Sequence, residues 1–199
     1  MPDERHRAVW RRTGPTDHEL VSTSGERLGR YWSYLPDIST ARATIGGVTL
    51  VVEGTGTIRR SLTARRAQDP DPTGSDEGEV PRGEVRFPAR RSGSPPGGQS
   101  GPPVAALHVS TLSWHGEVEV GSGEDAHGST GATTWALRRE PTLNLKWTIG
   151  PAANPLLTTE VRSRHVHLDT SATLLSDHPA VLALTMYLMQ HHRSGSTTR

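Results

Sequence analysis

Two histidines separated by one residue are the first candidates for chemistry. His165 and His167 alternate with Val166 and Leu168, and this alternation predicts that both imidazoles lie on one face of a strand. Imidazole nitrogens at such a spacing can bind zinc and related metals. The local sequence offers no third ligand, although His108, His115 and Asp169 could approach in three dimensions. Two histidines on the solvent face of a strand are the commoner arrangement, so we expect neither a metal nor any other cofactor.

Adjacent arginines form the second group of candidates. A guanidinium group binds phosphate through two parallel hydrogen bonds, so a cluster of arginines could hold an anionic headgroup. Neighbouring residues of a strand point to opposite faces, and each pair therefore contributes one arginine to a given surface. Arg59 and Arg138, on different predicted strands, are the predicted ligand-binding residues. The alternative is that all these arginines are solvated charges. The pairs are Arg11-Arg12, Arg59-Arg60, Arg65-Arg66, Arg90-Arg91 and Arg138-Arg139.

Sequence motifs of the common enzyme classes do not fit this chain. The glycine-rich segment 121–128 lacks the spacing of a phosphate-binding loop, and a strand-like segment follows it where such a loop would open a helix. The chain contains no G-x-S-x-G motif to support a serine nucleophile. Catalytic residues therefore stay unassigned, and a non-enzymatic protein is favoured over an enzyme.

The composition limits which partners and which cellular compartment we expect. The formal net charge of the 199 residues is +1, so nucleic acid is not expected as a partner. The chain has no cysteine, which excludes disulfides, thiol catalysis and zinc–thiolate sites. The first residues include no apolar signal segment, and we expect a cytoplasmic protein. Lys146 is the only lysine among many arginines, a usage typical of a GC-rich bacterium.

A helix is predicted over residues 179–190, and the fold around it must position the candidate histidines and arginines. Thr185 is the only polar residue between Pro179 and Gln190, and a helix that is apolar on every side must be surrounded by protein or lipid. Twelve helical residues extend about 18 Å, whereas a bilayer core of about 30 Å needs roughly 20 residues. We therefore expect a helix buried inside its own domain, capped by Ser176 or Asp177, and no transmembrane segment.

The rest of the chain is predicted to form β-strands. Gly46-Gly47 between two strand-like runs predicts a tight hairpin, and one buried helix needs a wall on every side, which a closed sheet supplies. We therefore predict a mainly β fold, an antiparallel β-barrel of about twelve strands that encloses the hydrophobic C-terminal helix. The predicted strands are 7–12, 18–22, 28–33, 40–45, 48–53, 57–65, 104–111, 116–120, 133–139, 143–149, 156–161, and 165–168 followed by 173–175.

Two segments are predicted to lie outside the barrel. Residues 67–103 are rich in proline, glycine, serine and charge, which is typical of a disordered loop insertion. Residues 194–199 are predicted to be a disordered tail. The domain organisation is thus one barrel over residues 1–193.

This pattern resembles a known superfamily. The chain is similar to the tubby C-terminal-like superfamily, and most to its branch of LURP-one-related and scramblase-like proteins, in two segments. These are the run DHPAVLALTMYL at residues 177–188 and the glycine-punctuated run GERLGR at residues 25–30, which leads into 41–45. The resemblance implies a twelve-stranded barrel around a C-terminal helix, contact with phosphoinositide or phospholipid, and no established catalysis.

Two classes of function follow. The first is a non-enzymatic binding or scaffold domain that contacts anionic phospholipid headgroups or a protein partner. The second is a small-molecule-binding barrel or enzyme with a pocket at one rim near His165 and His167. The first is favoured because a helix in the lumen leaves little room for a ligand.

Overall fold

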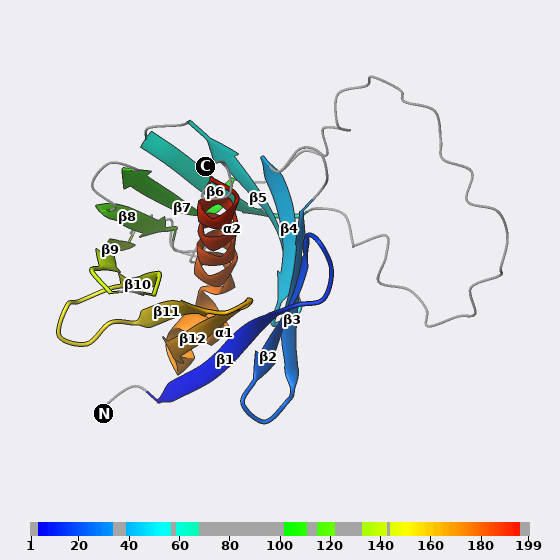
Figure 1. Cartoon of the computed structure of the whole chain (residues 1–199). Helices are drawn as coiled ribbons and strands as arrows, with labels where there is room; N and C mark the ends of the chain where they lie inside the picture. The colour runs from blue at the N-terminus through cyan, green and yellow to red at the C-terminus, as the bar shows by residue number, and fades with distance from the viewer. Residues whose placement is uncertain are drawn as a thin grey trace, which may run out of the picture.

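Twelve strands in the computed structural model form one closed antiparallel sheet (Figure 1). Each strand pairs with its neighbours in the sequence, and β12 closes the barrel against β1. The structure describes residues 4–33, 39–56, 59–67, 102–110, 115–121, 133–142 and 144–195. The strands are β1 (Arg5–Arg12), β2 (Asp17–Ser22), β3 (Arg27–Ser33), β4 (Thr40–Ile45), β5 (Val48–Thr55), β6 (Arg59–Arg66), β7 (Pro103–Ser110), β8 (His115–Val120), β9 (Thr133–Glu140), β10 (Lys146–Ile149), β11 (Leu157–Arg162) and β12 (His165–Ser171).

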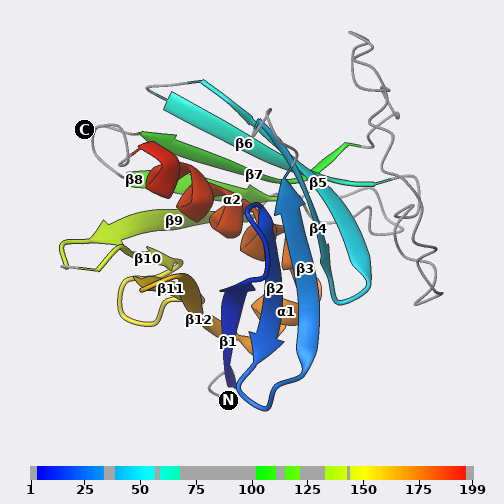
Figure 2. The same ribbon diagram turned by 45° about the vertical axis from the view of Figure 1, so that its right-hand side comes forward.

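The predicted mainly β barrel with an enclosed C-terminal helix is confirmed. Helix α2 (Pro179–Gly195) passes through the inside of the barrel (Figure 2), and every residue from Ala180 to Met189 is buried. Even Thr185 needs no outside partner, because its hydroxyl donates to the carbonyl oxygen of Val181 at 2.7 Å within the helix. The helix therefore forms the centre of the hydrophobic core. In the described part of the chain, no helix is both long enough and apolar enough to span a membrane.

The helix lies off the barrel axis. Its backbone runs closest to β4, β5, β6 and β7, where small inward-facing residues such as Ala41, Gly54 and Ala64 allow a close approach. At Gly54, an added Cβ would lie 2.5 Å from the Tyr187 hydroxyl oxygen. Away from these four strands, large buried aromatic residues occupy much of the wider space. These are Trp10 on β1, Tyr31 on β3 and Trp147 on β10.

Some predictions about the region before α2 were wrong. Residues 173–175 are not a strand, because Ser171 ends β12 and its hydroxyl accepts a hydrogen bond from the Leu174 amide at 3.2 Å. This N-cap starts the short helix α1 (Ala172–Asp177). Ser176 and Asp177 therefore belong to α1, and the first turn of α2 is closed by the His178 carbonyl, which accepts from the Val181 amide.

The segments predicted to be disordered are only partly covered by the structure. Ala67 follows β6, and Pro103 begins β7. The intervening residues 68–101 of the predicted loop lie outside the described residues. At the C-terminus, residues 194 and 195 continue α2, so the predicted tail begins too early. Residues 196–199 are also outside the described part.

The barrel has two ends, and one of them carries the features that concern function. At this end β1, β3, β5, β7, β9 and β11 finish, the even-numbered strands begin, and α2 emerges. We call it the C-terminal rim. The last residues of the six strands that end there are Arg12, Ser33, Thr55, Ser110, Glu140 and Arg162.

Candidate functional site

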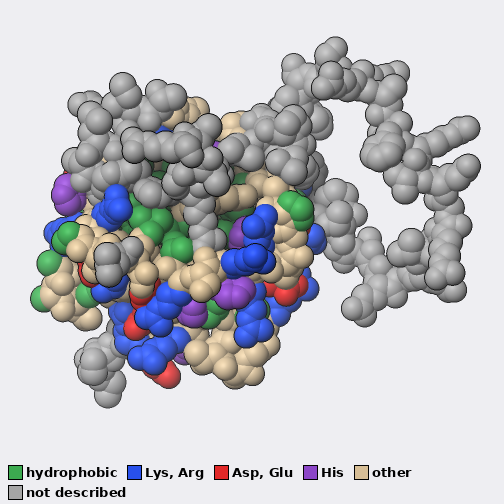
Figure 3. All heavy atoms as spheres, viewed as in Figure 1, with side chains coloured by type: hydrophobic (Ala, Val, Ile, Leu, Met, Phe, Trp, Pro, Cys, Tyr) green, Lys and Arg blue, Asp and Glu red, His purple; other side chains and the backbone are tan. Residues whose placement is uncertain are grey.

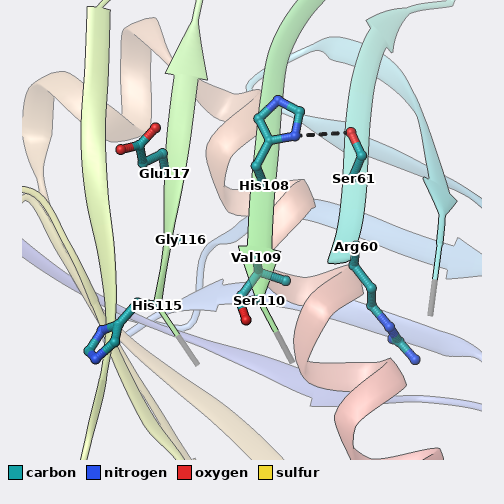
Figure 4. Close-up of a pocket in the computed structure, with 8 residues that line it drawn as sticks. All are labelled: Arg60, Ser61, His108, Val109, Ser110, His115, Gly116 and Glu117. Atoms are coloured by element: carbon teal, nitrogen blue, oxygen red, sulfur yellow. Dashed lines mark hydrogen bonds between the residues drawn. The ribbon is translucent and has the colours of Figure 1, made fainter. Parts of the chain in front are cut away.

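A hollow of about 720 Å³ lies at the C-terminal rim, where β6 begins, β7 ends and β8 begins (Figure 4). We call it the rim hollow. Its described lining contains two imidazoles, two hydroxyls, one guanidinium group and one carboxylate, so polar groups are available to a ligand in the hollow. The lining residues are Arg60, Ser61, His108, Val109, Ser110, His115, Gly116 and Glu117.

Strand register places three polar residues in one row on the outer face. Ser61 lies opposite His108, and His108 lies opposite Glu117. The Ser61 hydroxyl and His108 Nδ1 are 3.2 Å apart, and the tautomer of the ring decides which atom donates. Figure 4 shows the Glu117 carboxylate turned away from the imidazole. Among the described residues, the pair therefore has no third group that would orient a catalytic base, and the row is better suited to hydrogen bonding a ligand.

Gly116 allows the strand ends that form the rim hollow to approach closely. A Cβ at this position would overlap the carbonyl oxygen of His108 on the neighbouring strand. The position faces the lumen, since it alternates with the buried Val118 and Val120 on β8. Any side chain there would have to push β7 and β8 apart. The glycine therefore keeps His108 and His115 on one continuous surface.

Arg60 brings a cation into the rim hollow from the inner face of β6. It alternates with Leu62 and Ala64, which are both buried in the lumen. The Arg60 Nε atom is buried, and no described residue accepts a hydrogen bond from it. A buried N–H group without an acceptor is costly, and a bound acceptor would remove that cost. This guanidinium is thus suited to bind an anion.

The two arginines predicted from the sequence both lie next to the rim hollow. Through its backbone, Arg59 is paired with Ser110 at the end of β7, and Arg138 on β9 is paired with His115 at the start of β8. Val109 and Gly116 are also a pair, so the ends of β7 and β8 are adjacent and connect these two positions. Among the described residues, no carboxylate forms an ion pair with Arg138.

Carboxylates elsewhere along the C-terminal rim are occupied by other cations. Glu140 accepts from Lys146 at 2.7 Å, and Glu160 accepts from Arg162 at 2.6 Å. The Arg162 hydrogen bond and that from Asn144 hold the pKa of Glu160 below its ordinary value. Because these acids are paired, they offset little of the positive charge at Arg60 and Arg138.

The face of the barrel formed by β1, β11 and β12 differs from the rim hollow. Figure 3 shows basic side chains over these strands with acidic ones among them. Arg5 donates to Asp169 at 2.7 Å and Arg162 to Glu160. The basic side chains of this face are thus partly neutralised by acidic partners, and the face should attract an anion only weakly.

His165 and His167 lie on this mixed face rather than at the rim hollow. As predicted, they flank the inward-facing Val166. Neither of them lines the rim hollow. Partial burial, followed by the nearby charge of Arg162 and by His165, lowers the pKa of His167. Within the described ranges, no group of three or more histidine, aspartate or glutamate residues is arranged to hold a metal ion.

His108 and His115, considered from the sequence only as distant metal ligands, are instead central to the rim hollow. Asp169 is engaged by Arg5 on the other side of the barrel. Ser61 and Glu117 were not singled out from the sequence, because only the pairing of β6, β7 and β8 places them beside His108. An available signal was the alternation of His115, Glu117 and Glu119 with apolar residues on one strand.

Comparison with known proteins does not identify the chain. It matches no protein-family model, no curated protein and no solved structure. Its function must therefore be inferred from the fold and the rim hollow.

Proposed function

We propose that this protein is a non-enzymatic binding domain that docks on an acidic phospholipid surface through the C-terminal rim. The contact surface is centred on the rim hollow and consists of Arg60, His108, His115 and Arg138, which we call the basic surface, and the backbone of Arg59 lies beside it. The observation that carries the proposal is the strand register that brings β6, β7, β8 and β9 together here.

Two properties of the basic surface favour a phosphate-bearing surface as the ligand. Arg60 has a buried N–H group that lacks an acceptor among the described residues, and Arg138 is without an ion-pair partner in the same set. Guanidinium groups bind phosphate oxygens through paired hydrogen bonds, and a neighbouring hydroxyl such as that of Ser61 can add another. Glu117 is the only carboxylate in the described lining, and it points away from His108.

The fold supports a binding role over catalysis. Helix α2 fills the part of the lumen beside β6 and β7, so the rim hollow does not continue into an enclosed cavity that would exclude water from a reaction. The architecture is also the one that the resemblance to the tubby C-terminal-like superfamily implies, and membership of its LURP-one-related and scramblase-like branch is part of this proposal. Contact with phospholipid is the function implied there.

Co-sedimentation with lipid vesicles tests the proposal. The protein should sediment with phosphatidylcholine vesicles that contain phosphatidylserine and not with phosphatidylcholine alone. Salt should weaken the binding, because exposed charges are screened over about 8 to 10 Å near physiological ionic strength. Each basic residue contributes about 1 kcal/mol at an anionic membrane, so the double variant Arg59→Glu/Arg138→Glu should bind about 30-fold more weakly or worse.

A matched control separates the basic surface from total charge. Arg7 and Arg27 are exposed and lie away from the C-terminal rim, and Arg7→Glu/Arg27→Glu changes the net charge equally. This control should keep most of the binding. An equal loss in both double variants would place the contact elsewhere. Binding to neither vesicle, or to both equally, would remove the lipid proposal and leave a protein partner as the remaining binding function.

A further inference from the structure

A second cavity lies inside the barrel, on the wider side of the off-axis helix. It has a volume of about 130 Å³ and lies between α2 and the inner faces of β1, β2 and β12. We call it the lumen cavity. It is separate from the rim hollow, which involves β6, β7 and β8. Its lining includes Arg12, His18, Val166, Met186, Met189 and Gln190.

The lumen cavity has a polar mouth and an apolar interior. Arg12 is the last residue of β1 and lies opposite His18 on β2, so both lie at the C-terminal rim. Gln190 donates from Nε2 to the Ser33 hydroxyl at 3.1 Å beside them. Farther inside, Val166 lies opposite Trp10, and Met186 is one helical turn before Gln190. Tyr31 is fully buried, and its ring meets that of His18 edge-on with the two centroids 6.1 Å apart.

Arg12 is held in place at the mouth. Its Nε donates to the Gly14 carbonyl at 2.9 Å, and its Nη2 donates to the Pro15 carbonyl at 3.0 Å. A guanidinium group has five N–H donors, so these two bonds fix its plane and leave donors for a ligand. Among the described residues, no carboxylate pairs with Arg12. A fixed guanidinium of this kind is suited to a carboxylate.

We propose that the lumen cavity binds a short-chain carboxylate. The carboxylate group is held by Arg12 at the mouth, beside His18, and the alkyl chain lies among Val166, Met186 and Met189. An engineered apolar cavity of about 150 Å³ holds benzene, so the volume of about 130 Å³ suits a ligand of a few carbon atoms. Methionine side chains are flexible and adapt their shape to a small apolar ligand.

Isothermal titration calorimetry of the full chain with sodium acetate, propionate, butyrate and octanoate tests this inference. Affinity should rise from acetate to butyrate as the chain fills the apolar part, and octanoate should bind at least tenfold more weakly because it exceeds the space. Butyramide has the shape of butyrate without the charge and should not bind measurably. Equal affinity for butyrate and butyramide, or no binding of any carboxylate, would refute the inference.

Two arginines that are neighbours in the sequence provide a matched pair of variants. Arg12→Gln should weaken butyrate binding at least tenfold, whereas Arg11→Gln should change it less than twofold, because Arg11 is exposed and points away from the lumen. Equal effects of the two changes would show only a general charge effect and would overturn the proposed site. Met189→Phe should fill the cavity and abolish binding. If that variant does not fold, as judged by circular dichroism, the comparison of Arg12→Gln with Arg11→Gln still tests the inference.

Discussion

Replacing Leu184 by alanine tests whether α2 is the centre of the core. Leu184 is completely buried in the lumen. Removal of its three outer carbon groups forfeits about 2.4 kcal/mol of transfer free energy, and the remaining cavity raises the cost to about 3 to 5 kcal/mol. A domain of this size has about 5 to 15 kcal/mol of stability. The variant should therefore fold but be much less stable.

The expected shift can be measured by thermal unfolding followed with circular dichroism. One kcal/mol corresponds to about 2 to 4 °C in a chain of this length, so Leu184→Ala should lower the Tm by about 6 to 20 °C. Leu184→Asp should not fold, because an unpaired carboxylate in the lumen costs several kcal/mol more. The control is Leu28→Ala, since Leu28 is only half-buried on β3 and should lose less than half as much. A Leu184→Asp variant that melts cooperatively near the wild-type Tm would refute a core built around α2.

Three further perturbations probe α1, the rim hollow and the mixed face. Ser171→Ala removes the N-cap of α1 and should reduce the unfolding free energy in urea by about 1 kcal/mol. Gly116→Ala should cost about 1 to 3 kcal/mol, since its Cβ overlaps the His108 carbonyl; an unchanged urea midpoint would contradict this close approach. The lowered pKa of His167 means that the unfolded chain binds the proton more tightly, so this residue reduces stability as the pH falls through its ordinary value of 6.5. His167→Gln should make the loss of Tm from pH 8 to pH 5 smaller, and an identical pH profile would argue against the shift.

The barrel and its helix could be predicted because their signals are local. An unbroken apolar run identifies α2, and alternation together with turn residues identifies the strands. The prediction failed at residues 173–175, whose apolar and β-branched types suit a strand. There the hydrogen bond from the Leu174 amide to the Ser171 hydroxyl outweighed strand propensity. A cap of this kind depends on the backbone angles of one residue and not on a periodic pattern.

The candidate site was predicted only in part, because register is a property of pairs of strands. Arg59 and Arg138 could be named individually as anion ligands, but their position beside one hollow follows from the pairing of four consecutive strands. A shift of one residue in any of these pairs would turn the row of Ser61, His108 and Glu117 to different faces. For His165 and His167 the common face was predicted correctly, because it depends on one strand alone. The charges around them could not be predicted, because they come from the neighbouring strand β11.

The off-axis position of α2 explains why the two proposed binding regions differ in kind. Beside β4 to β7, small wall residues let the helix pack against the sheet, so a ligand at β6 and β7 has access only to the rim and the outer face. An open, charged surface of this kind suits the proposed contact with phospholipid headgroups. Beside β1, β2 and β12 the same displacement leaves the lumen cavity, which is the proposed site of a small carboxylate. The distribution of small and large residues around the wall thus determines where the barrel offers an open surface and where it offers an internal cavity.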